Sequence, residues 1–286
     1  MIRFSIATSG NIDSLIKLWS LCFGDDPKYL NRFFNHAFER AKIYIATDRE
    51  EIISSLSVFY VSYCSISGDT IPGGYLYGVS THPEHRGKQL SSLLLSYAKS
   101  ELASENLEFL ITRPAEESLF ELYEKMGFNS SLYLSKKCVD IDEFLISPEI
   151  EAPQTLLASD FYSIREKYLK RHRISHIAWS NEMLDFIITD ITNNGGLALR
   201  IGERYCIGYP EKDHIILLEH TFGEQIVDLI PYFKYRYPQS KTFTSFQPSR
   251  PNDISNERRY LATSLTKNQI AKRLSEENCY FNFPME

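Results

Sequence analysis

Apolar residues recur with the period of a helix in some segments of the chain and with the pattern of a strand in others. Residues 11–23 and 25–38 carry apolar side chains every three to four positions, which predicts two consecutive helices. Asp26 followed by Pro27 is typical of a helix start, because aspartate caps the first amide groups and proline fits the first helical turn. Strands are predicted on both sides of this helix pair, over residues 2–8, 41–47 and 51–66.

Strands and helices then alternate towards the middle of the chain. The predicted strands are residues 73–81, 107–112 and 127–141, and the predicted helices are residues 90–103 and 118–126. Such an alternation after a run of hairpins is typical of an α/β fold in which helices cover both faces of a mixed sheet.

The second half of the chain repeats this order of elements. Its predicted helices are residues 160–172, 181–193 and 223–235, and its predicted strands are residues 196–201, 204–209, 214–222 and 241–246. The repeat concerns the pattern of elements and not the letters. A segment near residue 150 has two prolines and little periodicity, so we predict two domains, residues 1–148 and residues 149–286.

Composition and charge narrow the classes of protein. Hydrophobic residues make up 43% and charged residues 24% of the 286 residues, which is typical of a globular protein. No segment predicts a membrane span or a secretion signal, so we expect a cytoplasmic protein. Residues 1–150 hold 14 Lys+Arg and 20 Asp+Glu, which accounts for the whole net charge of −6. This charge argues against nucleic acid as the main partner.

The cysteines and histidines predict no metal site. The five cysteines are scattered and show no C-x-x-C spacing, so we expect reduced, mostly buried thiols. His82 and His85 lie three apart beside Glu84, which would suit a metal, but surface histidines are the preferred interpretation. The basic segment 170–176 would suit nucleic acid, but a solvated helix end is preferred there.

A basic loop joins the strand that ends at Thr81 to the helix that begins at Leu90. Such a turn points backbone N–H groups at one spot, and Arg86 and Lys88 add positive charge, so phosphate or pyrophosphate would fit. A Walker loop does not fit, since eight residues separate Gly78 from Gly87, and no G-x-G-x-x-G motif is present. A solvated turn without a ligand remains the alternative on the loop alone.

The surroundings of this loop resemble a known family. Residues 79–90, VSTHPEHRGKQL, are similar to motif A of the GCN5-related N-acetyltransferases (the GNAT superfamily). Residues 119–128, LFELYEKMGF, resemble motif B of the same superfamily, one helix and one strand later. The resemblance implies a mixed, mostly antiparallel sheet flanked by helices. It also implies transfer of an acetyl group from acetyl-coenzyme A to a primary amine by direct attack, without a metal.

Roles for individual residues follow from that resemblance. Tyr123 would give a proton to the departing thiolate. Asp25 and Asp26 would meet a cationic amine acceptor. The end of the first motif would pair with the pantetheine arm and polarise the thioester carbonyl, and the residues implied are Val79, Ser80 and Thr81. The loop would hold the pyrophosphate through Arg86, Gly87, Lys88, Gln89, Leu90 and Ser91. The far end of the cofactor would meet Ser118 and Phe120.

The chain departs from motif A at one position of the loop. Gln89 stands where the family commonly has a second glycine, and Ser91 takes the place of the last small residue. A side chain at position 89 would crowd the pyrophosphate. The alternative function is therefore a catalytically idle coenzyme-A-binding or structural protein.

The second half extends the resemblance to tandem-domain acetyltransferases of the enhanced-intracellular-survival type. It lacks an R-G-x-G loop, since LEHTFGEQIVDL occupies that place, so we expect a degenerate GNAT-like domain without a coenzyme A site. The acceptor implied is a small polyamine, an aminoglycoside-like molecule or a peptide amine. In that family the terminal carboxylate reaches the cleft of the first domain, which makes Glu286 a candidate base. Tyr280, Phe281 and Phe283 suggest a docked tail, and a homo-oligomer is compatible with the resemblance.

Overall fold

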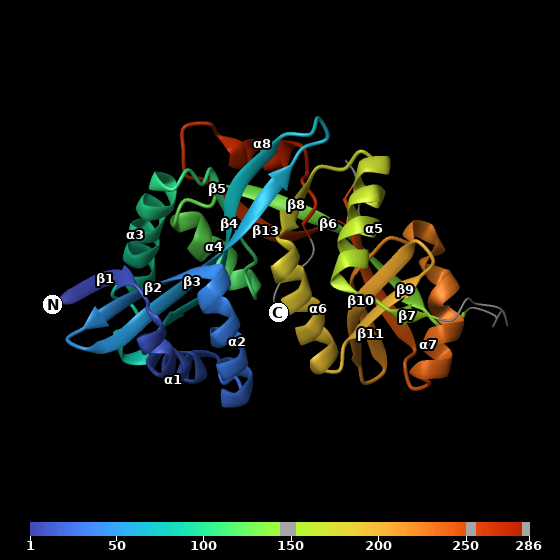
Figure 1. Ribbon diagram of the computed structural model, residues 1–286, viewed down its shortest axis with the longest axis horizontal. Coiled ribbons are helices and arrows are strands. Elements are labelled where there is room, and N and C mark those ends of the chain that lie inside the picture. The colour runs from blue at the N-terminus through green and yellow to red at the C-terminus, as the bar shows by residue number, and fades with distance from the viewer. Residues whose placement is uncertain (144–152, 250–255, 282–286) are drawn as a thin grey trace. The chain divides into compact units, whose positions relative to one another are not determined.

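The computed structural model describes residues 1–143, 153–249 and 256–281, which form two compact units. The first unit consists of Met1–Tyr63, Thr70–Ser131 and Tyr260–Glu276. The second unit consists of Cys64–Asp69 and Leu132–Arg259 together with the described residues from Glu277 onward. Figure 1 labels most elements of both units, which are described separately below.

The first unit is a mixed sheet with strand order β1-β2-β3-β4-β5-β13. Its strands are β1 (Ile2–Ile6), β2 (Ala41–Asp48), β3 (Glu51–Cys64), β4 (Thr70–Thr81), β5 (Phe109–Thr112) and the end of β13 (Asn256–Ser264). Its helices are α1 (Ile12–Phe23), α2 (Pro27–Arg40), α3 (Leu90–Ser104), α4 (Glu117–Lys125) and α8 (Ile270–Glu276). The pairs β1–β2, β2–β3 and β5–β13 are antiparallel, and β4–β5 is parallel.

Helices cover both faces of this sheet because neighbouring strand residues point to opposite sides. Tyr44 and Leu76 belong to the core under α3 and α4. On the other face Phe59 and Tyr77 pack against Phe33 of α2, with ring centroids 6.1 Å and 5.8 Å apart. Asp26 caps α2 by accepting from the amide of Lys28, with Pro27 as the first helical residue, which confirms that predicted helix start.

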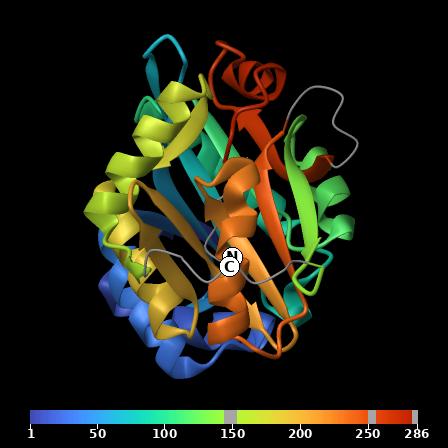
Figure 2. The ribbon, with the colours of Figure 1, turned by 90° about the vertical axis from the view of Figure 1, so that its right-hand side faces the viewer.

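The second unit repeats this architecture. Its strand order is β6-β12-β11-β10-β9-β7, with β11 and β12 parallel. The strands are β6 (Ser130–Asp140), β7 (Gln154–Thr155), β8 (His176–Trp179), β9 (Leu197–Ile201), β10 (Arg204–Glu211), β11 (His214–His220) and β12 (Thr242–Pro248). The helices are α5 (Ala158–Arg171), α6 (Asn181–Asn193), the 3₁₀ helix η3 (Gly223–Leu229) and α7 (Ile230–Arg236). In Figure 2 the orange helix α7 lies in front of these strands.

A buried ion pair holds α5 against the sheet of the second unit. Arg165 Nε donates to Glu219 Oε1 at 2.8 Å, and the Tyr205 hydroxyl donates to the same carboxylate. Burial lowers the pKa of Arg165, but the adjacent Glu219 carboxylate more than offsets this, so the net pKa is raised. The guanidinium therefore stays charged and paired.

Two strands pair with partners that the order of the chain did not suggest. Residues Leu134–Asp140 of β6 pair with Thr242–Pro248 of β12, whereas Leu261–Ser264 of β13 pairs with Phe109–Thr112 of β5. The compact units therefore divide the chain differently from the predicted domains 1–148 and 149–286. The predicted linker at residues 144–152 lies outside the described residues.

Some local predictions were wrong or incomplete. The single helix predicted over residues 223–235 is η3 followed by α7, because Pro231 lacks an N–H and interrupts the hydrogen-bonding series. β7, β8, β13 and α8 were not predicted. The five cysteines are free, but only Cys206 and Cys279 are buried, and Cys138 is exposed on β6, so the prediction of mostly buried thiols was wrong.

In the described part of the chain no helix has the length and apolar character to cross a membrane.

Gly78 lets β4 pass close to α1. Its φ is 60°, in the left-handed region, and a Cβ at this position would lie 2.2 Å from Cη2 of Trp19. The Trp19 indole also packs against Tyr77, 5.7 Å between ring centroids. The glycine is thus required both by backbone conformation and by contact.

We predict that Gly78→Ala destabilises the first unit by more than the strain of a positive φ alone. The matched control is Gly24→Ala, because Gly24 has a φ of 78° and a Cβ added there would meet no atom within 4 Å. The control should lower the free energy of unfolding by about 1–2 kcal/mol. Gly78→Ala should lower it by about 2 kcal/mol more, because Trp19 must move. Urea denaturation monitored by Trp19 fluorescence in a Trp179→Phe background measures both. Equal losses would show that the contact with Trp19 does not matter.

Candidate functional site

Strand β4 separates from β5 before β4 ends. The two strands pair in parallel from Gly73–Phe109 to Leu76–Thr112, where β5 stops, and the Thr112 hydroxyl donates to the Leu76 carbonyl at 3.0 Å. β4 continues to Thr81. The last residues of β4 therefore have no strand beside them on the β5 side.

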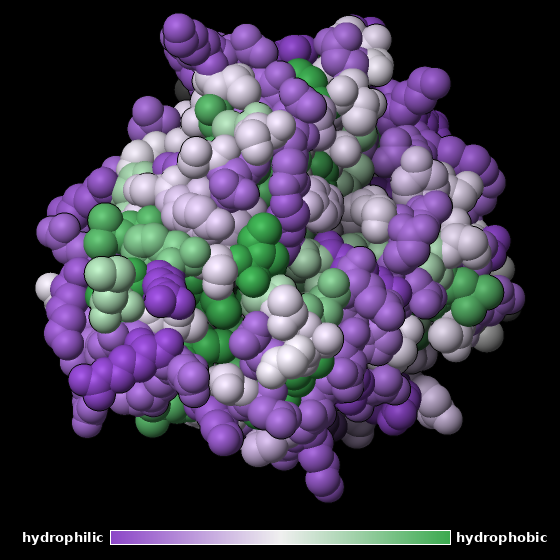
Figure 3. Space-filling view, turned by 60° about the vertical axis from the view of Figure 1, so that its left-hand side comes forward, coloured by the Kyte–Doolittle hydropathy of each residue, from purple (hydrophilic) through white to green (hydrophobic). Residues whose placement is uncertain are grey.

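A cavity of about 190 Å³ opens at this point within the first unit. Six of the predicted site residues line it: Val79, Ser80, Thr81, Arg86, Ser91 and Tyr123. Five further lining residues were not predicted: Cys22, Phe23, Leu119, Leu122 and Met126. Phe23 and Leu122 are 49% and 41% exposed although both are apolar. Figure 3 shows hydrophobic side chains gathered among hydrophilic ones on the side of the molecule that it presents.

Hydrogen bonds to β3 fix the end of β4. Ser54 Oγ donates to the Ser80 carbonyl at 2.7 Å, and the Ser55 and Ser80 hydroxyls lie 2.8 Å apart. The carbonyl oxygen of Thr81 accepts from Arg86 Nε at 3.2 Å and from Cys22 Sγ at 3.4 Å. The edge of the cavity is therefore rigid on the β3 side.

The loop before α3 adopts conformations that suit glycine. Gly87 has a φ of 75°, and Gln89, the residue just before α3, has a φ of 59°. Gln89 therefore occupies a left-handed conformation that costs a residue with a Cβ about 1–2 kcal/mol. Arg86, Gly87, Lys88 and Gln89 are all exposed. The backbone keeps the shape expected of a glycine at position 89 although the side chain is glutamine.

Tyr123 of α4 is a buried residue of the cavity lining. Its side chain is only 8% exposed, and its ring packs edge-on against Phe128 with centroids 5.6 Å apart. Burial raises the pKa of Tyr123 above its ordinary value, and a hydrogen bond with the Thr112 side chain partly offsets the rise. The phenol therefore carries its proton at neutral pH.

Other predicted residues lie outside the lining of this cavity. Leu90 and Phe120 are buried in the core under α3 and α4. The Ser118 hydroxyl donates to the carboxylate of Glu116, and Lys88 Nζ donates to the Glu84 carbonyl at 3.2 Å. These four residues support the walls and the loop, but they do not touch the cavity as it stands.

The two acidic residues after α1 have different surroundings. Asp25 is half-buried, and its Oδ2 accepts from Trp19 Nε1 at 2.6 Å. Asp26 is exposed and caps α2. Asp25 is thus linked through Trp19 to Gly78, next to the cavity, whereas Asp26 has a local structural role.

His82 and His85 lie on the 3₁₀ turn after β4. His82 Nδ1 accepts from the Glu84 amide at 3.3 Å, so the ring caps this turn. Within residues 1–143, 153–249 and 256–281, no group of three or more His, Cys, Asp or Glu side chains could hold a metal ion.

Only part of the predicted C-terminal tail lies within the residues that the structure describes. Tyr280 and Phe281 are 3% and 0% exposed and dock within the second unit, where Ile177 donates to the Tyr280 carbonyl at 2.9 Å. Phe281 packs on Trp179 with centroids 5.8 Å apart. Phe283 and the candidate base Glu286 lie outside the described residues.

Comparison with solved structures supports the fold of the whole chain. A GCN5-related N-acetyltransferase from Kribbella flavida has a TM-score of 0.70 at 13% identity, over 92% of this chain and 70% of that one. Eis1 from Mycobacterium abscessus has a TM-score of 0.64 at 8% identity, over 93% and 74%. A tandem GNAT protein from the clavulanic acid biosynthesis pathway has a TM-score of 0.53 at 8% identity, over 94% and 100%.

The sequence comparison agrees for the first part of the chain. No curated protein matches the sequence. Residues 3–130 match the family model of the acetyltransferase (GNAT) domain, and they include the diverging strand, the loop and Tyr123. The chain therefore carries an acetyltransferase domain of the GNAT superfamily, a family of enzymes that transfer an acyl group from acyl-coenzyme A.

Proposed function

We propose that the first unit transfers an acetyl group from acetyl-coenzyme A to a small molecule or peptide that bears a primary amine. The observation that carries this proposal is the cavity where β4 diverges from β5, lined by Val79–Thr81, Arg86, Ser91 and Tyr123. It joins a strand edge without a neighbouring strand on the β5 side, a cation in the loop before α3 and a protonated phenol. The direct attack of the amine on the thioester needs these three features and no covalent enzyme intermediate.

The loop before α3 would hold the pyrophosphate of the cofactor. Arg86 now donates to the Thr81 carbonyl, at one end of the cavity, and its exposed side chain is free to turn to an anion. The left-handed conformations of Gly87 and Gln89 alternate with ordinary ones, which turns backbone N–H groups towards one side of the loop. The Gln89 side chain would then affect the affinity for the cofactor, while the backbone conformation of the loop remains suited to binding the pyrophosphate.

The end of β4 would hold the reacting end of the cofactor. Because no strand pairs with Val79–Thr81 on the β5 side, the pantetheine amides can take the place of a neighbouring strand there. A backbone N–H of this segment would donate to the thioester oxygen as negative charge develops on it.

Tyr123 would supply the proton to the departing thiolate. A phenol with a raised pKa is protonated throughout the neutral range, so it begins each turnover as a donor. The amine must lose a proton as well, and none of the described residues that line the cavity is Asp, Glu or His. The terminal carboxylate of Glu286 remains our candidate base.

Asp25 is the better candidate of the two aspartates for contact with a cationic acceptor. Only one of its oxygens bonds Trp19, so the other is available to an ammonium group. The acceptor class therefore remains small polyamines, aminoglycoside-like molecules or peptide amines. The five free cysteines favour the predicted cytoplasmic location.

We predict that Arg86→Ala weakens the binding of acetyl-coenzyme A. Loss of a charge-assisted bond to phosphate should raise Kd about tenfold or more and reduce the rise in Tm that the cofactor causes. Arg3→Ala is the matched control, because Arg3 is exposed on β1 and does not line the cavity. Calorimetric titration and thermal unfolding measure both effects. If saturating acetyl-coenzyme A leaves Tm of the wild-type protein unchanged, the cofactor assignment is wrong.

Gln89→Gly should keep or raise the stability of the first unit and tighten cofactor binding several-fold. Glycine removes the strain of the left-handed conformation, which offsets its entropic cost in the unfolded chain. The control Ser92→Gly replaces an α3 residue, where glycine should cost about 0.5–1 kcal/mol. Thermal unfolding and titration with acetyl-coenzyme A compare the two. Equal destabilisation by both would refute the argument from conformation.

Tyr123→Phe should lower kcat by roughly 10²–10⁴-fold, with little change in cofactor Kd, if the phenol is the general acid. Tyr97→Phe removes a phenol from the same unit but not from the cavity, so it should keep wild-type kcat. Release of free thiol from acetyl-coenzyme A, measured over a panel of amines, provides the assay. A folded Tyr123→Phe variant with unchanged kcat would leave Tyr123 with a packing role. Cofactor binding without turnover of any amine would favour the idle alternative.

A further inference from the structure

The second unit keeps the strand divergence of the first but surrounds it with different chemistry. β11 pairs with β12 in parallel only from His214–Thr242 to Leu217–Ser245, and both strands then continue. This is the same four-residue pairing that β4 and β5 show before they separate. The turn that follows β11 corresponds to the cofactor loop of the first unit, although it lacks the basic glycine motif.

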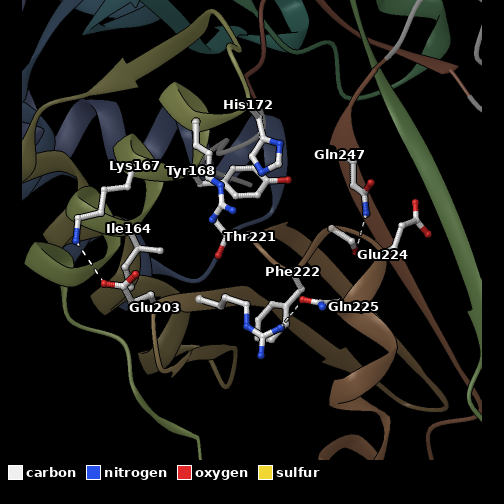
Figure 4. Close-up of a pocket in the computed structure, with 13 residues that line it drawn as sticks. Ile164, Lys167, Tyr168, His172, Glu203, Thr221, Phe222, Glu224, Gln225 and Gln247 are labelled. Atoms are coloured by element: carbon white, nitrogen blue, oxygen red, sulfur yellow. Dashed lines mark hydrogen bonds and ion pairs between the residues drawn. The ribbon is translucent and has the colours of Figure 1, made fainter.

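A cavity of about 530 Å³ lies at this place, wholly within the second unit. Its walls are the C-terminal half of α5, the turn between β9 and β10, the turn after β11, and Gln247 of β12. Figure 4 shows His172 and Tyr168 on one side of the space and Gln247 and Glu224 on the other. The volume is typical of sites that bind small molecules.

Hydrogen bonds hold the turn after β11 in place. The Thr221 hydroxyl accepts from the Tyr205 amide at 3.0 Å, and the His220 Nδ1 accepts from the Phe222 amide at 3.2 Å. Burial lowers the pKa of His220 to about 3, so the ring is neutral at pH 7 and can accept this bond. The side of the cavity formed by this turn is therefore preformed.

Arg204 presents an oriented guanidinium at the cavity. Its Nη1 donates to Gln225 Oε1 at 2.9 Å, and its Cζ lies 4.7 Å from the centre of the Phe222 ring. Its acidic neighbour Asp228 lies at the long distance of 3.8 Å and does not line the cavity. Only part of the hydrogen-bonding capacity of the guanidinium is thus used.

The remaining charges leave the cavity with an excess of positive groups. Of the two acidic residues in the lining, Glu203 pairs with Lys167 at 3.6 Å, and Glu224 pairs with Lys137 of β6 at 2.8 Å. Arg171 lines the same wall as Lys167, and no other described residue forms a hydrogen bond or ion pair with its side chain. Arg171 is thus unpaired among the described residues, Arg204 has as acidic partner only the long contact with Asp228 at 3.8 Å, and His172 lies beside Arg171.

We propose that this cavity binds a phosphorylated small molecule, with Arg171 and Arg204 as its principal phosphate ligands. Two guanidinium groups suit the charge of about −1.5 to −2 on a phosphate better than the single charge of a carboxylate. Lys167 can leave its exposed partner Glu203 at little cost, because exposed ion pairs contribute at most about 1 kcal/mol. Tyr168 is half-buried and packs against His172 at an interplanar angle of 44°, with ring centroids 4.5 Å apart, so its ring can contact the rest of the ligand.

Titration of the full chain with sodium pyrophosphate at low ionic strength tests the proposal. Arg171→Gln and Arg204→Gln should each raise Kd about tenfold or more, because each removes a charge-assisted bond. Lys170→Gln is the matched control, because Lys170 is exposed on the same helix, carries the same charge and does not line the cavity. The variants are compared in an Arg86→Ala background, because the loop of the first unit is itself proposed to bind pyrophosphate, and binding should persist in that background. Circular dichroism checks that each variant is folded. If Arg204→Gln does not fold, Arg171→Gln tests the proposal alone, because Arg171 is exposed.

Several results would overturn the proposal. Absence of pyrophosphate binding in the wild-type chain would do so, as would equal Kd values for Arg171→Gln and Lys170→Gln. Binding that disappears in Arg86→Ala would belong to the loop of the first unit. Citrate serves as a polyanion without phosphate, and binding of citrate as tight as that of pyrophosphate would refute the phosphate class.

Discussion

The early end of β5 is the constraint on which the proposed chemistry depends. A parallel pair that stops at Leu76 and Thr112 leaves the following residues of β4 held on one side only. Serine hydroxyls of β3 secure that held side, and Gly78 allows the bend by accepting a left-handed conformation under Trp19. The free side is then an edge to which an extended ligand can add as if it were a strand. The loop and Tyr123 are useful only because this edge exists.

The two units show how one backbone arrangement can support two kinds of site. In the first unit the cavity at the diverging strands is small and largely apolar, with Arg86 as its one charged residue among the described lining. In the second unit the corresponding cavity is larger and is lined by charged and amide side chains. The difference comes from side chains and from the turn after the central strand, since the parallel pairing has the same length in both units. Loss of a cofactor motif therefore need not mean loss of a binding cavity.

Short sequence motifs predicted the part of the candidate site that lies on contiguous residues. The segment 79–91 and Tyr123 were identified because a strand, a basic loop and a helix follow one another directly. Cys22 and Phe23 were not identified, because α1 is distant in the sequence and carries no motif. Leu119, Leu122 and Met126 were not identified, since periodicity does not distinguish a core side chain from one that lines a cavity. Position 89 was judged by its residue type, whereas its φ of 59° shows a glycine-like backbone.

The sequence by itself determined the kind and order of most elements, the start of α2 at Asp26 and Pro27, and the membership of residues 3–130 in an acetyltransferase family. These features depend on local propensity, periodicity and contiguous motifs, all of which can be seen along the chain. Only the tertiary structure decided that β6 pairs with β12 and that β13 completes the sheet beside β5. Only the tertiary structure likewise placed Arg171 and Arg204 around one cavity. Strand partners and pocket walls are chosen by contacts between residues far apart in the sequence, and a single sequence carries no local signal of such contacts.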